Sequence, residues 1–275
     1  MNTIYAAIIM DVIQSRKYDE QERFNIQEKL YKIIKFINNC YKNEIVKDYD
    51  FSAGDSIQAL FNNVSDAFSS YCLIKTLFYP YKIRCGIGYG KLNQKILDVN
   101  YNNTNMLDGE AYHYAISALN DCKEKKCNFL LYSNKNESNK LVNQIMSTVE
   151  IFTLEHSTKQ ADVFELFNLL YPLENKNSFK INDENIEFII TTIKENIQSY
   201  ELDDLTLVKH VLLDDFKSDT NTPDFPTKIN SICAQLLNVS RQNIEKIRTV
   251  GFFDKIRILE KLVLDYMRNE YKERE

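Results

Sequence analysis

The sequence predicts an α+β protein that begins with a ferredoxin-like core, in the order β-α-β-β-α-β, and continues as an all-α region. Apolar strand-like segments and helical segments alternate over about the first 120 residues. Five of the six glycines lie between Gly54 and Gly109, within and beside those strands. A polar, turn-rich stretch begins at Pro172, and only helical periodicity follows it.

The first strand and the first helix have the clearest patterns. Residues 4–10 are apolar throughout and run straight into Asp11. Residues 19–39 have helical periodicity, in which Phe24 and Leu30 are predicted to share an apolar face with three isoleucines further along. A strand followed by an amphipathic helix is therefore expected.

The next segments complete the core. Residues 45–50 lead into a strand pair that turns at Gly54-Asp55. A helix over about 65–78 and a strand over 81–90 follow. In a ferredoxin-like topology the first and third strands are neighbours, so Asp11 is expected to lie beside Asp55.

The remaining segments suggest a second, helical domain. After the core we predict a polar loop over 93–107, a helix that begins at Gly109, a strand over 128–132, a helix over 138–147 and a strand over 163–169. Helices are then expected over 185–199, 204–216, 227–237, 240–248 and 252–271. We therefore predict a palm domain over residues 1–171 and a helical domain over 185–275, joined by a linker over 172–184.

Composition narrows the class of protein. The chain is 44% hydrophobic with a net charge of −5, so it can bury a full core but has no overall basic field that attracts nucleic acid. No apolar run approaches the roughly 20 residues that cross a bilayer, and the N-terminus lacks the basic region of a signal peptide. The six cysteines form no CxxC pair, which favours reduced core thiols over zinc. A cytoplasmic protein without a membrane partner is expected.

Two aspartates form the main candidate site. Asp11 ends an apolar strand, and Asp55 occupies the neighbouring turn. Two carboxylates held together repel unless a cation lies between them, and carboxylate oxygens suit Mg²⁺ or Mn²⁺. We predict that Asp11 and Asp55 bind metal and are catalytic. The alternative is a strand-end cap and an ordinary turn aspartate.

Three further features are candidates for ligand binding. Ser15 and Arg16 can bind phosphate through the fork of arginine donors, or can form a solvated cap before the first helix. His113, between two tyrosines, can contact a base or transfer a proton, or can simply pack. The G-x-G-x-G spacing of Gly86, Gly88 and Gly90 is not a dinucleotide fingerprint and indicates close approach of a backbone or a ligand.

Residues 229–248 resemble a helix-turn-helix. Ser240 is a natural cap for the second helix. The residues whose types suit contacts to DNA are Arg241, Gln242, Asn243 and Lys246, with Arg248 adding charge. The alternative is a helix pair used for packing or dimerisation.

Several of these segments together resemble the SatD family and a reduced class III nucleotide cyclase palm. The segments are residues 11–16, 54–58, 84–90 and 109–113, together with the helix that contains Gln27. The resemblance covers about residues 3–120 and implies a palm that binds Mg²⁺ or Mn²⁺ and a nucleotide. The cofactor-binding residues that it implies are Val12, Ile13, Ser15, Arg16, Gly54 and Arg84.

Two departures from the cyclase pattern leave the function open. His113 stands where the cyclase helix has Asn, and Ser117 stands where it has the arginine that stabilises the transition state. The resemblance implies a Mg-dependent nucleotide-binding palm that acts on a nucleoside triphosphate as a cyclase or nucleotidyltransferase. The alternative is a non-enzymatic regulator with a palm that senses a nucleotide or cyclic nucleotide and a helix-turn-helix that binds DNA or a partner. Cyclase palms commonly work as dimers, so a homodimer is one expectation.

Overall fold

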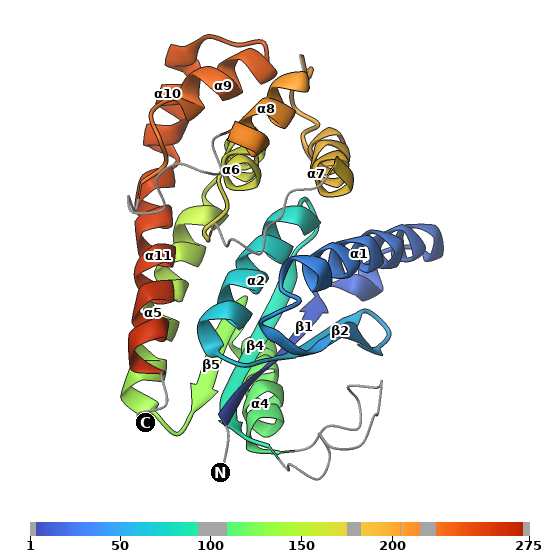
Figure 1. The fold of residues 1–275 in the computed structure, drawn as a ribbon, viewed down its shortest axis with the longest axis vertical. Helices are drawn as coiled ribbons and strands as arrows, with labels where there is room; N and C mark the ends of the chain where they lie inside the picture. The colour runs from blue at the N-terminus through green and yellow to red at the C-terminus, as the bar shows by residue number, and fades with distance from the viewer. Residues whose placement is uncertain (1–3, 93–108, 175–182, 204, 215–223, 272–275) are drawn as a thin grey trace. The chain divides into compact units, whose positions relative to one another are not determined.

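The computed structural model describes residues 4–92, 109–174, 183–203, 205–214 and 224–271 (Figure 1). The chain forms two compact units, residues 1–147 with 263–275, and residues 148–262. The limits between the units fall inside two helices, α5 (Asn136–Leu154) and α11 (Phe253–Glu270). The two independent domains predicted above, 1–171 and 185–275, stay a prediction. The predicted loop over 93–107 and residues 175–182 of the predicted linker lie outside the described residues.

The first unit contains a five-stranded sheet in the order β2-β3-β1-β4-β5. The strands are β1 (Ile4–Val12), β2 (Ile45–Ala53), β3 (Ser56–Phe61), β4 (Ile83–Lys91) and β5 (Phe129–Ser133). All neighbours are antiparallel except β4 and β5, which are parallel. The central β1 pairs with both β3 and β4, which confirms the predicted ferredoxin-like arrangement.

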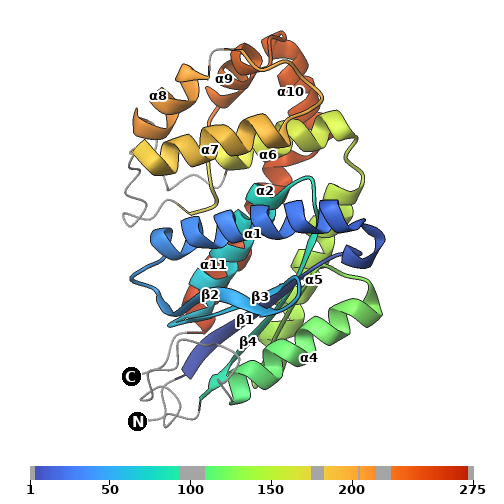
Figure 2. The same cartoon turned by 90° about the vertical axis from the view of Figure 1, so that its right-hand side faces the viewer.

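Helices cover both faces of this sheet. The helices α1 (Glu20–Cys40) and α2 (Val64–Phe78) lie on one face, and α4 (Glu110–Lys125) lies on the other (Figure 2). Asp19 caps α1 by accepting a hydrogen bond from the Glu22 backbone N–H at 2.8 Å. The prediction that Phe24 belongs to the buried face of α1 is wrong, because Phe24 is 61% exposed. Ile26, with the helical spacing to Leu30, is buried instead.

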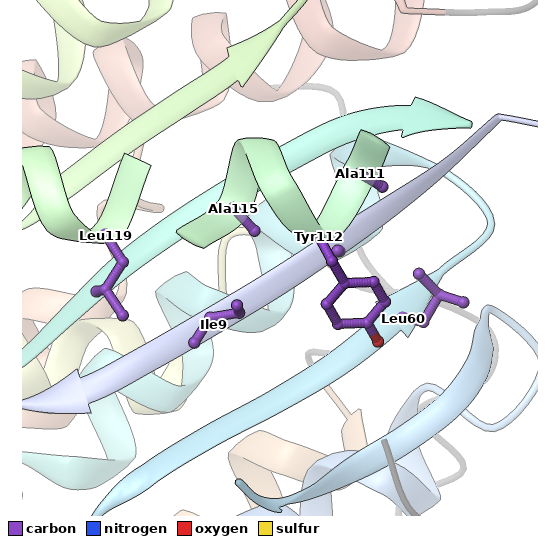
Figure 3. Packing of buried hydrophobic residues seen from close by; sticks show 7 residues of the cluster. Ile9, Leu60, Ala111, Tyr112, Ala115 and Leu119 are labelled. Atoms are coloured by element: carbon purple, nitrogen blue, oxygen red, sulfur yellow. The ribbon is translucent and has the colours of Figure 1, made fainter. Parts of the chain in front are cut away.

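Two glycines set how closely α4 approaches the sheet. A Cβ atom on Gly86 would lie 2.4 Å from the carbonyl oxygen of Ala115, and one on Gly88 would lie 2.0 Å from that of Ala111. These positions therefore have no room for a side chain, which confirms close approach of a backbone. Ala115 and Leu119 pack over Ile9 of β1 in a buried cluster (Figure 3).

The strand β5 forms one edge of the sheet, and side chains of α5 occupy its hydrogen-bonding groups. The Asn143 side-chain oxygen accepts from the Leu131 backbone N–H at 2.8 Å, and its amide donates to the Leu131 carbonyl at 3.0 Å. The Asn139 amide donates to the Ser133 carbonyl at 3.0 Å. The Tyr271 hydroxyl, which follows α11, donates to the Asn139 side-chain oxygen at 2.8 Å.

The second unit is helical. Besides the parts of α5 and α11 that fall in it, its helices are α6 (Thr158–Leu170), α7 (Asp183–Asn196), α8 (Thr206–Asp214), α9 (Ile229–Leu236) and α10 (Arg241–Val250). The predicted strand over 163–169 is wrong, because these residues lie in α6. Residues 162–170 of α6 are almost all buried, and the apolar residues among them resemble a buried strand. The polar residues Asp162, Glu165 and Asn168 recur every three positions, which is a helical spacing that the strand prediction overlooked.

An aromatic cluster lies in the core of this second unit. His156 packs against the rings of Phe164 and Phe253, and its Nε2 lies 2.8 Å from the Gly251 carbonyl oxygen. Burial lowers the pKa of His156, so the neutral ring is favoured in the folded unit. Among the helices of the described ranges, none combines the length and apolar character that crossing a membrane requires.

Candidate functional site

A pocket of about 250 Å³ opens beside the predicted metal and phosphate residues. Three chain segments line it: the turn after β1, the first turns of α1, and the turn between β2 and β3. The lining residues are Ser15, Arg16, Arg23, Ile26, Gln27, Gly54 and Asp55. Four of these seven residues, Ser15, Arg16, Gly54 and Asp55, were predicted from the sequence. The structure therefore brings them together.

The local sequence explains the shape of this pocket. Gly54 has φ +62°, a left-handed conformation that glycine adopts without strain, so the chain reverses tightly between β2 and β3. A short 3₁₀ turn over Ser15–Lys17 then leads to the Asp19 cap of α1. The Gln27 side chain donates to the Gly54 carbonyl at 3.4 Å and so links α1 to the turn.

The pocket has excess positive charge. Arg16 and Arg23 are both exposed, and within the described part of the chain neither guanidinium group makes an ion pair. Asp55, in the turn between β2 and β3, is half-buried and lines the same pocket. Two unpaired arginines with a serine hydroxyl suit a ligand that carries phosphate, since the guanidinium fork matches phosphate oxygens.

Sequence reasoning missed Arg23 and did not assign Gln27 to the site. Both project from the exposed side of α1, where polar residues are expected without any function. The helical spacing of Arg23 and Gln27 could have indicated that they belong to the site. The two residues are four apart on the helix, so they share a face, and that face begins just after the Ser15-Arg16 turn.

Asp11 lies in a different environment from Asp55. It is only 8% exposed, and two cations contact its carboxylate. Lys123 Nζ of α4 lies 2.8 Å from Oδ2, and the Arg84 guanidinium of β4 lies 3.4 Å from Oδ1. Arg84 and Asp11 are register partners on adjacent strands. Lys123 could not be found from the sequence, because its contact depends on how α4 crosses β1.

The donor set fits a divalent metal only in part. Among the described residues, no three His, Cys, Asp or Glu side chains cluster as ligands would. Asp11 and Asp55 are two carboxylates at one end of the sheet, which is the number that Mg²⁺ commonly takes from protein when phosphate oxygens and water complete its shell. Asp11, however, already has a cation on each oxygen. Asp11 points toward α4 and does not line the pocket, whereas Asp55 lines it from the side of α1. A metal shared by Asp11 and Asp55 therefore stays a prediction.

The other predicted palm residues lie outside this pocket. Val12 is buried at the end of β1, and the Ile13 backbone N–H donates to the Lys82 carbonyl at 2.9 Å, so it is already engaged. His113 is on the exposed side of the first turns of α4 and lines neither described pocket. Its catalytic role stays a prediction. Ser117 is also exposed on α4.

A second pocket, of about 380 Å³, lies between β5, α4 and α5, and no predicted site residue lines it. Its main polar groups are engaged within the fold. Lys125 Nζ lies 2.8 Å from Asp121 Oδ2, and the Tyr132 hydroxyl donates to the same oxygen. Hydrogen bonds to Asp121 raise the pKa of Lys125, which keeps this pair charged. The pocket is therefore part of the framework around the β5 edge.

In the second unit, α9 and α10 form the predicted helix pair. The Ser240 hydroxyl accepts from the Asn243 backbone N–H at 3.2 Å, which confirms the predicted cap. The predicted DNA-contact residues Arg241, Gln242, Asn243 and Lys246 are all exposed.

The added role of Arg248 in DNA binding is wrong. Arg248 is buried, and its guanidinium donates to both carboxylate oxygens of Asp254, at 2.8 and 2.5 Å. It also donates to the Phe225 carbonyl at 2.7 Å. Its charge is therefore compensated inside the fold.

Comparison with known proteins gives one family and a set of partial structural likenesses. The sequence profile of the SatD family matches residues 5–202. A comparison with proteins of curated function finds no match.

Three solved structures illustrate the partial likenesses. A bacterial light-regulated adenylyl cyclase is 14% identical, with 47% of this chain and 75% of that chain covered at a TM-score of 0.34. The adenylyl cyclase CyaB from P. aeruginosa is 14% identical, with 46% and 76% covered at a TM-score of 0.34. The catalytic core of a rhodopsin-guanylyl cyclase with converted specificity, in complex with ATPαS, is 12% identical, with 43% and 72% covered at a TM-score of 0.34.

Proposed function

The chain belongs to the SatD family, and we propose that its palm is a nucleotide-binding domain whose phosphate site is the pocket beside Asp55. The observation that carries the proposal is the pair of exposed arginines, Arg16 and Arg23, without ion-pair partners in the described chain. The Ser15 hydroxyl adds a donor at the same place. A nucleoside triphosphate presents several anionic oxygens, which these groups can bind together.

The proposed site also binds Mg²⁺ or Mn²⁺. Asp11 and Asp55 would hold the ion with phosphate oxygens, and a bound divalent ion would neutralise phosphate charge. We place nucleotide binding ahead of catalysis, because Ser117 carries no charge where cyclase palms have an arginine. In a cyclase or nucleotidyltransferase reaction, a hydroxyl would attack the α-phosphate and release pyrophosphate. Arg16 and Arg23 are then the pocket cations that would stabilise the developing charge.

The first test measures nucleotide binding. Titration calorimetry with ATP, GTP and cyclic nucleotides, with and without Mg²⁺, compares the wild type with the double variant Arg16→Ala, Arg23→Ala. We expect the double variant to lose affinity about 100-fold, since each charge-assisted contact contributes about 1.5 kcal/mol or more.

Lys17→Ala is the matched control. Lys17 is an exposed cation next to Arg16 that does not line the pocket, so its removal should change affinity less than about three-fold. No binding to the wild type, or equal losses in control and double variant, would contradict the proposal. Pyrophosphate release from each triphosphate with Mn²⁺ separates an enzyme from a sensor: sustained release supports the enzyme, and stoichiometric binding without release supports the sensor.

A second candidate function is DNA binding by α9 and α10. The favouring observation is that all four base- and phosphate-contact candidates are exposed on the first turns of α10 behind the Ser240 cap. With Arg248 buried, the local positive charge consists of Arg241 and Lys246. Replacing both with alanine should weaken DNA retention and reduce the salt slope by about two units. Absence of retention by the wild type at low salt would assign the helix pair to packing or to a protein partner.

A homodimer is part of the proposal because cyclase palms commonly pair. Sedimentation equilibrium over a range of protein concentrations tests it. A constant monomer mass at all concentrations, with nucleotide present, would exclude it.

A further inference from the structure

The second unit has an exposed apolar face that no part of the proposed function uses. Ten large apolar side chains in the described ranges are exposed, and six of them lie on the last turns of α5, the end of α10 and the first turns of α11. These six, which we call the α5–α11 face, are Ile151, Leu154, Val250, Phe252, Ile258 and Leu262. The two helices meet here, because the Phe152 and Phe252 rings lie 5.2 Å apart. Exposed apolar residues that gather in this way mark an interaction surface, whereas single ones need no explanation.

Helical spacing places these side chains in two rows. Ile151 and Leu154 are three residues apart on α5 and share one side of it. Ile258 and Leu262 are four apart on α11 and share one side of that helix. The opposite side of α11 is the buried one, where Ile256 lies. The exposed rows are therefore additional to the core of the unit, and they suit packing against further helices.

The turn between α10 and α11 presents an aromatic ring at a strained position. Phe252 has φ +56°, a left-handed conformation that bulky residues rarely adopt. Its ring nevertheless stays 42% exposed beside Phe152, so burial in the core does not explain why this residue is held there. Strained residues of this kind gather at functional positions, which supports a binding role for the α5–α11 face.

Two opposite charges lie at the same end of the face. Glu155 is exposed immediately after α5, and Lys255 is exposed on the first turn of α11, with its ammonium 4.8 Å from the centroid of the Phe252 ring. Within the described part of the chain, neither of these two charges makes an ion pair. A surface that has an acid on one helix and a base on the next is complementary to a copy of itself.

The symmetry of such a pairing follows from the position of the two charges. A two-fold axis that runs along the helices and between them places α5 of one copy opposite α11 of the other. Glu155 and Lys255 stay at the same height in this arrangement, so each pairs with the opposite charge of the second copy. The apolar rows of α5 and α11 then face each other between these two ion pairs.

We propose that the α5–α11 face binds a second copy of this chain in a two-fold dimer, with Glu155 of each copy paired to Lys255 of the other. The inference goes beyond the proposed function, because it concerns the second unit and requires no nucleotide. It also differs from a dimer formed by the palms, which would use the first unit.

The experiment measures the mass of the full-length protein by sedimentation equilibrium over a range of concentrations without nucleotide. The wild type should form a dimer. Ile258→Glu should weaken dimerisation at least about 100-fold, because the symmetric interface would bury the new charge twice. Glutamate has good helix propensity and the position is exposed, so α11 should be retained, which circular dichroism checks.

Ile116→Glu is the matched control. Ile116 is 48% exposed on α4 of the palm, compared with 39% for Ile258, and the substitution is the same. Its dimer should be as stable as that of the wild type. A dimer that dissociates with Ile116→Glu and persists with Ile258→Glu would be formed by the palms, and it would overturn the proposal.

Charge exchange tests the orientation of the two copies. Glu155→Lys alone and Lys255→Glu alone should each weaken the dimer about ten-fold, because like charges then meet twice. The double variant Glu155→Lys, Lys255→Glu should recover the affinity of the wild type to within about three-fold. A general loss of stability would not be recovered in this way, so failure of the double variant to recover would overturn the proposed pairing.

A monomeric wild type at every concentration would also overturn the proposal and would leave the face to a different protein partner. The nucleotide titrations decide the proposed function separately. Nucleotide binding by a monomer supports the proposed function and removes the dimer, whereas a dimer that binds no nucleotide does the reverse.

Discussion

Asp11 and Asp55 lie at the same end of the sheet, yet one is enclosed and the other is open. Asp11 is covered by α4 and contacts two cations, whereas Asp55 lines a pocket beside two unpaired arginines. From the sequence, both are simply aspartates at strand ends. The comparison shows that the charges which neighbouring helices bring to a carboxylate decide whether it is available to a ligand.

Moving α4 away from the sheet tests how far the enclosed side depends on close packing. Gly88→Ala places a Cβ within 2.0 Å of the Ala111 carbonyl oxygen and 2.3 Å of the Ala115 nitrogen, so the helix must shift. We expect a loss of about 3 kcal/mol in the free energy of unfolding. Urea unfolding followed by circular dichroism measures it, since the chain has no tryptophan.

Gly54→Ala is the matched change on the open side. No atom lies within 4 Å of the added Cβ, so only the positive φ is strained. A loss of about 1 kcal/mol is expected. Equal losses at Gly54 and Gly88 would show that close packing of α4 is not what distinguishes the two sides.

Removing the charge of Asp11 and of Asp55 in separate variants shows how much each carboxylate contributes to stability. Asp11→Asn leaves Arg84 and Lys123 without their anion, and the Arg84 Nε is already buried with no acceptor among the described residues. We expect a loss of about 2 kcal/mol in unfolding free energy. Asp55→Asn should change it by less than about 0.5 kcal/mol, because no ion pair is lost. Thermal unfolding of both variants gives the two values, and a larger loss for Asp55→Asn would reverse the assignment.

An effect of the opposite sign is expected for a hydroxyl on the enclosed side. Tyr112 is 4% exposed and packs over Leu60, and its hydroxyl has no hydrogen-bond partner within the described chain (Figure 3). Burial raises the pKa of Tyr112, so the group is neutral. Tyr112→Phe removes an unsatisfied polar atom, and stability should stay equal or rise by about 1 kcal/mol. A clear loss in the same unfolding assay would mean that the hydroxyl has a partner.

The order of elements in the core could be predicted because local patterns specify it. The apolar strand before Asp11, the Gly54-Asp55 turn and the glycines of β4 each have one physical explanation, and together they give the ferredoxin-like order. The strand predicted over 163–169 failed for a related reason. The apolar residues of α6 are as dense as those of a buried strand, and only the three-residue spacing of Asp162, Glu165 and Asn168 distinguishes the helix.

The candidate site could be predicted only where residues are close in sequence or follow from strand order. Ser15, Arg16, Gly54 and Asp55 met this condition and converge on one pocket. Lys123 did not, because its contact with Asp11 depends on the path of α4 across the sheet. Arg248 is the opposite case, a residue that was predicted to be functional and is structural. Its charge suggested a surface role, but contacts with Asp254 and Phe225 place it in the interior.

The amide side chains along β5 have a consequence for how this protein behaves at high concentration. An exposed edge strand normally offers its backbone to another molecule, which can lead to sheet extension and aggregation. Here Asn143 occupies both the donor and the acceptor of Leu131, and Asn139 occupies the carbonyl of Ser133. At the opposite edge, β2 has register shifts against β3 that interrupt a regular ladder. Both features make a regular extension of the sheet at its edges less favourable.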